Sequence, residues 1–155
     1  MCGVRIRGLE RADIPALALL ERENFSDPWS ASAFESELSN PYGVTLVAER
    51  EGEILGYLSS HLICENLHIN TFCVREKDRG KGVASSLLAA LLNLAASTGA
   101  ESATLEARQS NTPALSLYQK FGFSPVGLRK RFYQAPAEDA VLMKKELHSD
   151  EDTRN

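Results

Sequence analysis

Alternation of apolar and polar residues predicts a chain rich in strands. Residues 4–7 alternate valine or isoleucine with arginine, which is the pattern of a half-buried strand. Glu51 and Gly52 separate two segments rich in β-branched and aromatic residues, which predicts a tight hairpin. The last two predicted strands are expected to pair antiparallel across a short loop. The predicted strands cover residues 4–7, 44–50, 54–64, 67–74, 103–108, 123–133 and 139–147.

Apolar positions three and four residues apart predict helices between these strands. Ser30 is expected to cap the second helix and Asn111 or Thr112 the fourth, while Pro15 and Pro113 suit a first helical turn. Early helices, a central sheet, two crossover helices and a closing hairpin predict an α/β or α+β sandwich. The predicted helices cover about residues 13–23, 30–40, 83–98 and 112–121.

Length and composition indicate one soluble globular domain. The chain has 155 residues, of which 43% are hydrophobic and 25% charged. We expect a single domain over residues 1–147 and a disordered tail over residues 148–155. The longest apolar segment, residues 87–96, is too short to span a bilayer, and the N-terminus lacks a signal-peptide pattern. The protein is therefore expected to be cytoplasmic, without membrane contact.

The charge balance narrows the class of partner. A net charge of -4 argues against direct nucleic-acid binding, which depends on neutralising many phosphates. A basic partner would suit this surface better. Arg129, Lys130 and Arg131 form a local basic run, which is either a solvated strand edge or a functional feature.

The cysteines predict neither disulfides nor a metal site. Cys2, Cys64 and Cys73 are odd in number and widely spaced, and they are expected to be reduced thiols. His61 and His68 each lie near a cysteine, but no second cluster follows at zinc-like spacing. We therefore expect no metal.

A glycine loop is the first candidate for chemistry. Residues 79–84 connect a predicted strand to the N-terminus of a predicted helix. Without side chains at Gly80 and Gly82, backbone N–H groups can approach an anion, and the helix dipole favours negative charge. A pyrophosphate would fit there. A plain turn between strand and helix is the alternative.

This loop resembles the acyl-CoA loop of the GNAT acetyltransferase superfamily, Gln/Arg-x-x-Gly-x-Gly/Ala, matched by Arg79, Gly82 and Ala84. The resemblance covers about residues 4–147. It implies a mostly antiparallel central sheet with a splayed strand pair, flanked by about four helices, and acetyl-CoA as co-substrate. The acetyl-CoA contacts that it implies are Phe72, Cys73, Val74, Arg79, Gly80, Lys81, Gly82, Val83, Ala84, Ser85, Asn111 and Tyr118.

Four local patterns are most similar to RimI-type enzymes, which acetylate the N-terminal alanine of a small-subunit ribosomal protein. They are residues 28–30, residues 74–84, residues 105–111 followed by 117–118 and 121–123, and residues 138–140 before Met143. The resemblance implies that Glu106 is the general base and Tyr118 the general acid. It also implies that Trp29 and Tyr133 frame the N-terminus of a peptide acceptor. The hairpin departs from the pattern, because Phe132 precedes Tyr133 and the loop is short.

Each implied role has a structural alternative. Glu106 alternates with apolar residues and is equally explained as the solvent-facing side of a strand. The Tyr118 ring falls at a core position, Asn111 can be only a helix cap, and Trp29 can be aromatic packing. Cys73 is better explained as a small apolar residue than as a nucleophile.

Two other functions stay open beside protein N-terminal acetylation. One is an acetyltransferase for a small amine such as a polyamine or an antibiotic. The other is a non-catalytic acyl-CoA-binding module, which would have no chemical use for both Glu106 and Tyr118. The sequence leaves the oligomeric state undetermined.

Overall fold

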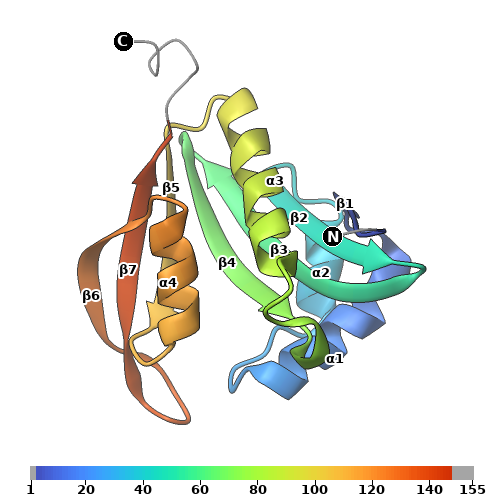
Figure 1. Ribbon diagram of the computed structural model, residues 1–155, viewed down its shortest axis with the longest axis horizontal. Coiled ribbons are helices and arrows are strands. Elements are labelled where there is room, and N and C mark those ends of the chain that lie inside the picture. The colour runs from blue at the N-terminus through green and yellow to red at the C-terminus, as the bar shows by residue number, and fades with distance from the viewer. Residues whose placement is uncertain (1–2, 148–155) are drawn as a thin grey trace. The chain divides into compact units, whose positions relative to one another are not determined.

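The computed structural model describes residues 3–147, which form the strands and helices labelled in Figure 1. The strands are β1 (Arg5–Gly8), β2 (Gly43–Arg50), β3 (Glu53–Ile63), β4 (Asn66–Val74), β5 (Ser102–Arg108), β6 (Ser124–Tyr133) and β7 (Glu138–Glu146). The helices are α1 (Ile14–Asn24), α2 (Ala31–Glu37), α3 (Val83–Ser97) and α4 (Thr112–Lys120). Two 3₁₀ turns, η1 (Arg11–Asp13) and η2 (Glu76–Asp78), precede α1 and α3. The mixed α/β class is confirmed. The predicted tail and Cys2 lie outside the described residues.

The strands are ordered β1-β2-β3-β4-β5-β7-β6. Antiparallel ladders join β1 with β2, β2 with β3, β5 with β7 and β6 with β7, whereas β4 and β5 pair in parallel. The parallel register runs from Asn66 opposite Ser102 to Ile69 opposite Leu105. The predicted, mostly antiparallel sheet is therefore confirmed.

The chain divides into two compact units. The first contains the chain up to His61 together with Asn70–Leu91, and the second contains Leu62–Ile69 together with the chain from Leu92 onward. The boundary crosses β4, so this strand contributes its first half to the second unit and its second half to the first.

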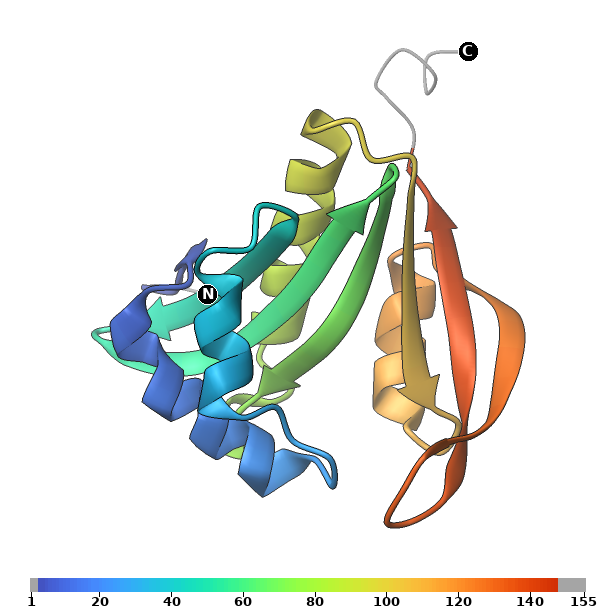
Figure 2. The same cartoon turned by 180° about the vertical axis from the view of Figure 1, so that it is seen from behind.

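In the first unit, helices cover both faces of the strands. Figures 1 and 2 show α1 and α2 on one face and α3 on the opposite face. The core between the strands and the first two helices includes Leu17, Phe34, Val47 and Tyr57, all fully buried. Trp29 packs at the edge of this core, with its ring centroid 5.2 Å from that of Phe34.

The predicted caps and turn determine where several of these elements begin and end. The Ser30 hydroxyl accepts a hydrogen bond from the Ala33 N–H (3.1 Å), and α2 ends at Glu37, followed by a turn rather than by three more helical residues. Glu51 and Gly52 adopt positive φ angles of 52° and 81°, as a two-residue hairpin turn requires. The cap at Ser30 and the hairpin turn are confirmed, whereas the second helix is shorter than the predicted residues 30–40.

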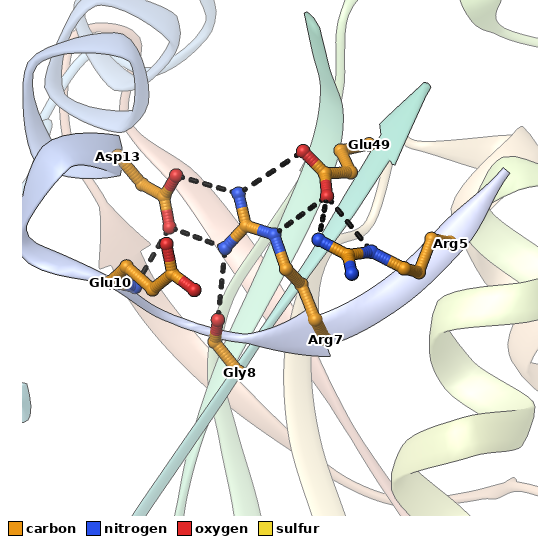
Figure 3. Close-up of polar contacts among 6 residues, drawn as sticks. All are labelled: Arg5, Arg7, Gly8, Glu10, Asp13 and Glu49. Carbon is orange, nitrogen blue, oxygen red and sulfur yellow. Dashed lines mark hydrogen bonds and ion pairs between the residues drawn. The ribbon is translucent and has the colours of Figure 1, made fainter. Parts of the chain in front are cut away.

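An ion-pair cluster attaches β1 to its neighbours (Figure 3). The Arg7 guanidinium binds the Asp13 carboxylate through both terminal nitrogens, at 2.7 and 2.8 Å, and its Nε lies 3.1 Å from Glu49. The Glu10 N–H also donates to Asp13 (2.8 Å), and Arg5 pairs with Glu49 on the more exposed side. The polar positions of the first strand thus connect η1, β1 and β2.

In the second unit, β5 separates a buried face from a polar one. Its residues alternate between buried and half-buried, with Ala103, Leu105 and Ala107 on the buried face. Helix α4 lies against one face of the strands (Figure 1), and its Tyr118 ring packs near Phe123 at a centroid distance of 5.9 Å.

Strand β6 ends the strand order and is exposed along nearly its whole length. Val126, Leu128 and Phe132 are 56%, 48% and 46% exposed. Its pairing with β7 is interrupted by two register shifts, and Arg131 in the second shift has a φ of 53°. The basic run found in the sequence therefore lies on an irregular, solvated edge strand.

Candidate functional site

Glu106 lies at the centre of a polar cluster on β5. Its carboxylate is 11% exposed and lies between two cationic or protonatable groups. His68 Nε2 lies 2.8 Å from Oε2, and Arg129 Nε lies 3.3 Å from Oε1. Arg129 comes from β6 and is 54% exposed, whereas the His68 side chain is 31% exposed, so Glu106 has one half-buried and one solvent-exposed partner.

A chain of hydrogen bonds orients His68. The parallel register places His68 opposite Thr104, and His68 Nδ1 lies 2.7 Å from Thr104 Oγ1. The Asn66 amide donates to the same hydroxyl oxygen (3.0 Å) and accepts from the Ser102 hydroxyl (2.8 Å). Because Thr104 accepts from Asn66, its own O–H is available to His68 Nδ1. His68 Nε2 then carries the proton and donates to Glu106.

These contacts set the protonation state of Glu106. The hydrogen bond from His68 holds the pKa of the carboxyl below its usual range, against the opposing effect of burial, and the positive charge of Arg129 acts in the same direction. The group is therefore a carboxylate at neutral pH. It is a weak base, suited to accept a proton from an amine that loses it readily.

The two tyrosines of the second unit differ from Glu106 in the direction of their pKa shifts. Burial raises the pKa of Tyr118, so its phenol stays protonated at neutral pH and can act as a proton donor. Burial, reinforced by the negative charge of Glu106, raises the pKa of Tyr133 to about 12. The Arg108 guanidinium lies 4.5 Å above the Tyr133 ring.

Arg108 also fixes the loop between β6 and β7. It donates to the carbonyl oxygens of Pro136 (3.0 Å) and Gln134 (3.1 Å) and pairs with Glu138 at 3.2 Å. Glu138 in turn accepts from the Ser110 N–H at 2.6 Å. The end of β5 therefore determines the position of the hairpin that carries Tyr133.

The glycine loop of the first unit has the backbone conformation that its sequence suggests. Gly80 and Gly82 have φ angles of 75° and 87°, in the left-handed region that favours glycine, and α3 begins directly afterwards at Val83. Arg79 donates from Nε to the Val74 carbonyl oxygen (2.9 Å), and its terminal nitrogen donates to Asn24. A Cβ at Gly80 would meet no atom within 4 Å, so its backbone is open to a ligand.

Two findings concern metals and membranes. Within residues 3–147, no group of three or more histidine, cysteine or acidic side chains is arranged to hold a metal ion. No helix in that range combines the length and hydrophobicity needed to cross a bilayer.

Cys64 is exposed and Cys73 is buried, and burial raises the pKa of Cys73 to about 11. The Cys73 thiol is therefore neutral, as expected of a packing residue.

Comparison with known proteins identifies the family. The model of the acetyltransferase (GNAT) family matches residues 14–123. The chain belongs to the GNAT family of acetyltransferases. It is 34% identical over 149 residues to the N-alpha-acetyltransferase RimI of Mycobacterium tuberculosis, covering 92% of both chains. It is 26% identical over 140 residues to the ribosomal protein bS18-alanine N-acetyltransferase of Escherichia coli, covering 89% of this chain and 94% of that protein.

The GNAT fold is also shared at the level of structure. The crystal structure of the ribosomal-protein-S18-alanine N-acetyltransferase from Escherichia coli superposes with a TM-score of 0.86. The superposition covers 93% of this chain and 94% of that chain, at 24% sequence identity. The architecture implied by the glycine loop is therefore confirmed.

The residues singled out from the sequence fall into both units of this GNAT chain. Trp29, residues 72–74 and residues 79–85 belong to the first unit, whereas Glu106, Asn111, Tyr118 and Tyr133 belong to the second. Within the second unit, the negative charge of Glu106 contributes to the raised pKa of Tyr133.

Some structural alternatives are directly visible. Asn111 Oδ1 accepts from the Ala114 N–H (3.3 Å) and caps α4, the Tyr118 ring is buried, and Trp29 packs on Phe34. None of these contacts excludes a role toward a ligand. The roles implied by the resemblance stay predictions.

The sequence did not reveal His68, Arg129 and Arg108 as neighbours of the candidate site. The alternating pattern of residues 67–74 placed His68 on a strand but gave no pairing partner. Arg129 was considered only as part of a basic run. Their proximity to Glu106 and Tyr133 follows from the strand registers, which the apolar pattern does not specify.

Proposed function

We propose that the protein is an acetyl-CoA-dependent N-alpha-acetyltransferase of the cytoplasm, and that its acceptor is the N-terminal alanine of a small-subunit ribosomal protein. The observation that carries the proposal is the oriented Glu106 carboxylate, with His68 at 2.8 Å, on strand β5 of an acetyltransferase fold. The relatives named above, which are N-terminal acetyltransferases, support the choice of acceptor.

The glycine loop suits the pyrophosphate of acetyl-CoA. Both of its glycines hold conformations that expose backbone N–H groups, and the loop leads into the N-terminus of α3, where the helix dipole favours anions. Residues 79–85 would bind the phosphates, and the backbone of Phe72, Cys73 and Val74 would bind the pantetheine arm. Asn111 is proposed as a further contact.

Two side chains of the second unit would move the protons of the reaction. Glu106, directly or through one water, accepts a proton from the acceptor ammonium, so that the amine can attack the thioester carbonyl. Tyr118, which stays protonated because it is buried, donates a proton to the departing thiolate. A backbone N–H near Val74 would stabilise the developing charge on the carbonyl oxygen.

The ordinary pKa values of the two kinds of amine favour an N-terminal amine over a lysine as acceptor. An α-amino group has a pKa near 8, whereas a lysine side chain has a pKa near 10.4. A weak carboxylate base removes a proton more readily from the α-amino group. Trp29 and Tyr133 are proposed to frame the peptide, and the net charge of -4 favours a basic protein as its source.

A CoA-release assay tests the proposal. The full-length protein is incubated with acetyl-CoA and a panel of acceptors that includes peptides beginning with alanine, matched peptides with a blocked N-terminus, polyamines and aminoglycosides. We expect release only with free N-termini, and most with the ribosomal sequence. Preference for a small amine would establish the alternative acetyltransferase. Tight acetyl-CoA binding with no release would establish a binding module.

A further inference from the structure

A carboxylate is buried in the core of the first unit. Glu21, on α1, is 1% exposed and lies in the same helix as the buried Leu17 and Leu20. Within residues 3–147 its contacts are hydrogen bonds from neutral donors, and it forms no ion pair. A buried carboxylate without a cationic partner carries a large desolvation cost, so its hydrogen bonds have to compensate.

The two oxygens of Glu21 bind different elements. Oε1 accepts from the backbone N–H of Trp29 at 2.8 Å, in the loop between α1 and α2. Oε2 accepts from the Tyr57 hydroxyl of β3 at 2.7 Å and from the Thr71 hydroxyl of β4. One side chain thus connects the Trp29 loop to two central strands.

The bond to Thr71 lies close to the proposed acetyl-CoA strand. Thr71 directly precedes Phe72, Cys73 and Val74 in β4. One turn after Glu21, Asn24 accepts a hydrogen bond from Arg79 of the glycine loop. The C-terminal end of α1 therefore contacts the Trp29 loop, β4 and the glycine loop, all within the first unit.

We infer that Glu21 is a positioning residue for the acceptor peptide, which it serves by fixing the Trp29 loop against β4. The inference rests on the proposed function, in which Trp29 contacts the peptide. Glu21 does not touch the reacting atoms. Its carboxylate is retained in an apolar core because a backbone N–H in the loop and two strand hydroxyls need a shared acceptor.

A pair of substitutions separates this role from simple packing. Glu21→Met has similar length and volume but no acceptor, so the Trp29 N–H loses its partner. Glu21→Gln keeps one carbonyl oxygen for Trp29, and its NH₂ group can donate to the Tyr57 and Thr71 hydroxyls, which can rotate to accept. Glu21→Gln is therefore the conservative variant expected to rescue the effect.

Two measurements report the result. Trp29 is the only tryptophan of the chain, so its fluorescence and its quenching by acrylamide report on this loop without any turnover. For Glu21→Met we expect stronger quenching and an acceptor KM raised by about tenfold, with kcat and the acetyl-CoA KM little changed. Glu21→Gln should resemble the wild type in both measurements.

The controls keep the inference falsifiable. Tyr57→Phe disturbs the same buried cluster without touching the Trp29 bond, so its quenching and acceptor KM should stay close to those of the wild type. If Tyr57→Phe matches Glu21→Met, loosening of the core is the cause and the inference is overturned. An unchanged acceptor KM or unchanged quenching in Glu21→Met also overturns it. Wild-type inactivity with every acceptor would refute the proposed function. The acrylamide quenching of Trp29 in the variants would still test whether Glu21 fixes the Trp29 loop.

Discussion

His68 Nε2 lies 2.8 Å from Oε2 of Glu106, although the two residues are 38 positions apart in the chain. The parallel ladder between β4 and β5 creates this contact, because it places His68 opposite Thr104 and near the next polar position of β5. The resulting arrangement of hydroxyl, imidazole and carboxylate holds the Glu106 carboxylate in one orientation, as its proposed role as a base requires.

Removal of the Glu106 charge should reduce turnover strongly. Glu106→Gln keeps the size of the side chain but cannot accept the ammonium proton. We expect kcat to fall by about 10²- to 10⁴-fold, with little change in acetyl-CoA affinity. A CoA-release assay together with calorimetric titration of acetyl-CoA measures both quantities. Near-normal turnover by the folded variant would exclude a role as general base.

Loss of His68 should shift the pH dependence of the reaction. The hydrogen bond from His68 lowers the pKa of Glu106, so His68→Phe should raise this pKa toward its ordinary value. Glu106 would then stay protonated to a higher pH. The acid limb of the kcat/KM profile should therefore move upward in pH.

Arg129→Gln provides the matched control for this profile. Arg129 lowers the same pKa by its charge alone and contributes less than His68, so a smaller shift in the same direction is expected. An acid limb that stays in place in the His68→Phe variant would show that Glu106 does not control the reaction in this pH range.

A methyl group at Gly56 should disturb the proposed pantetheine strand. An added Cβ at Gly56 would lie 2.7 Å from the Cys73 carbonyl oxygen and 3.1 Å from the Val74 Cα, both backbone atoms of β4. Gly56→Ala should therefore displace this strand, raise the acetyl-CoA KM and destabilise the protein by about 1–3 kcal/mol.

Kinetics at varied acetyl-CoA and denaturant unfolding measure these two effects. Gly8→Ala is the control, because an added Cβ there meets no atom within 4 Å. Wild-type acetyl-CoA kinetics in Gly56→Ala would argue against a role for Cys73 and Val74 in acetyl-CoA binding.

The ion pair between Arg7 and Asp13 (Figure 3) should make the stability of the protein depend on pH. Burial alone would raise the pKa of Asp13, but the hydrogen bonds from Arg7 and the Glu10 N–H outweigh it and hold the pKa below its ordinary value. The stabilisation is complete above the unfolded-state pKa of about 4 and is lost as the pH falls through the lower folded-state value. Asp13→Asn should cost about 1.5–3 kcal/mol at neutral pH.

Urea unfolding at neutral and acidic pH tests this expectation. The difference in the free energy of unfolding between the wild type and Asp13→Asn should become smaller in acid. Arg5→Ala serves as the comparison, because the Arg5 side chain is 68% exposed and its removal should change stability by under about 1 kcal/mol. A pH-independent difference would mean that packing, not charge, accounts for the role of Asp13.

The sequence was sufficient to predict the elements and their order. Period-two and helical patterns located the strands and helices within a few residues, and local chemistry located the caps, since Ser30 and Asn111 act on N–H groups three residues away. The parallel alignment of β4 with β5 could not be predicted, because register between distant strands is set by tertiary packing. The contact between His68 and Glu106 was missed for that reason.

Glu21 shows a second limit of the sequence pattern. Leu20 and Glu21 are neighbours on α1 and both are buried, so helical periodicity alone does not distinguish Glu21 from an apolar core position. The pattern could not indicate that the carboxylate has three donors, because these come from a loop and two strands far along the chain. Roles toward ligands, such as those of Tyr118 and Trp29, depend on atoms outside the chain and stay predictions.

The irregularity of β6 has a consequence for the behaviour of the protein in concentrated solution. An exposed edge strand that carries Val126, Leu128 and Phe132 would ordinarily be a template for the strand of another molecule. The two register shifts and the left-handed Arg131 interrupt the row of backbone donors and acceptors, and the neighbouring cations repel an identical edge. The outermost strand can thus stay exposed to solvent without seeding aggregation.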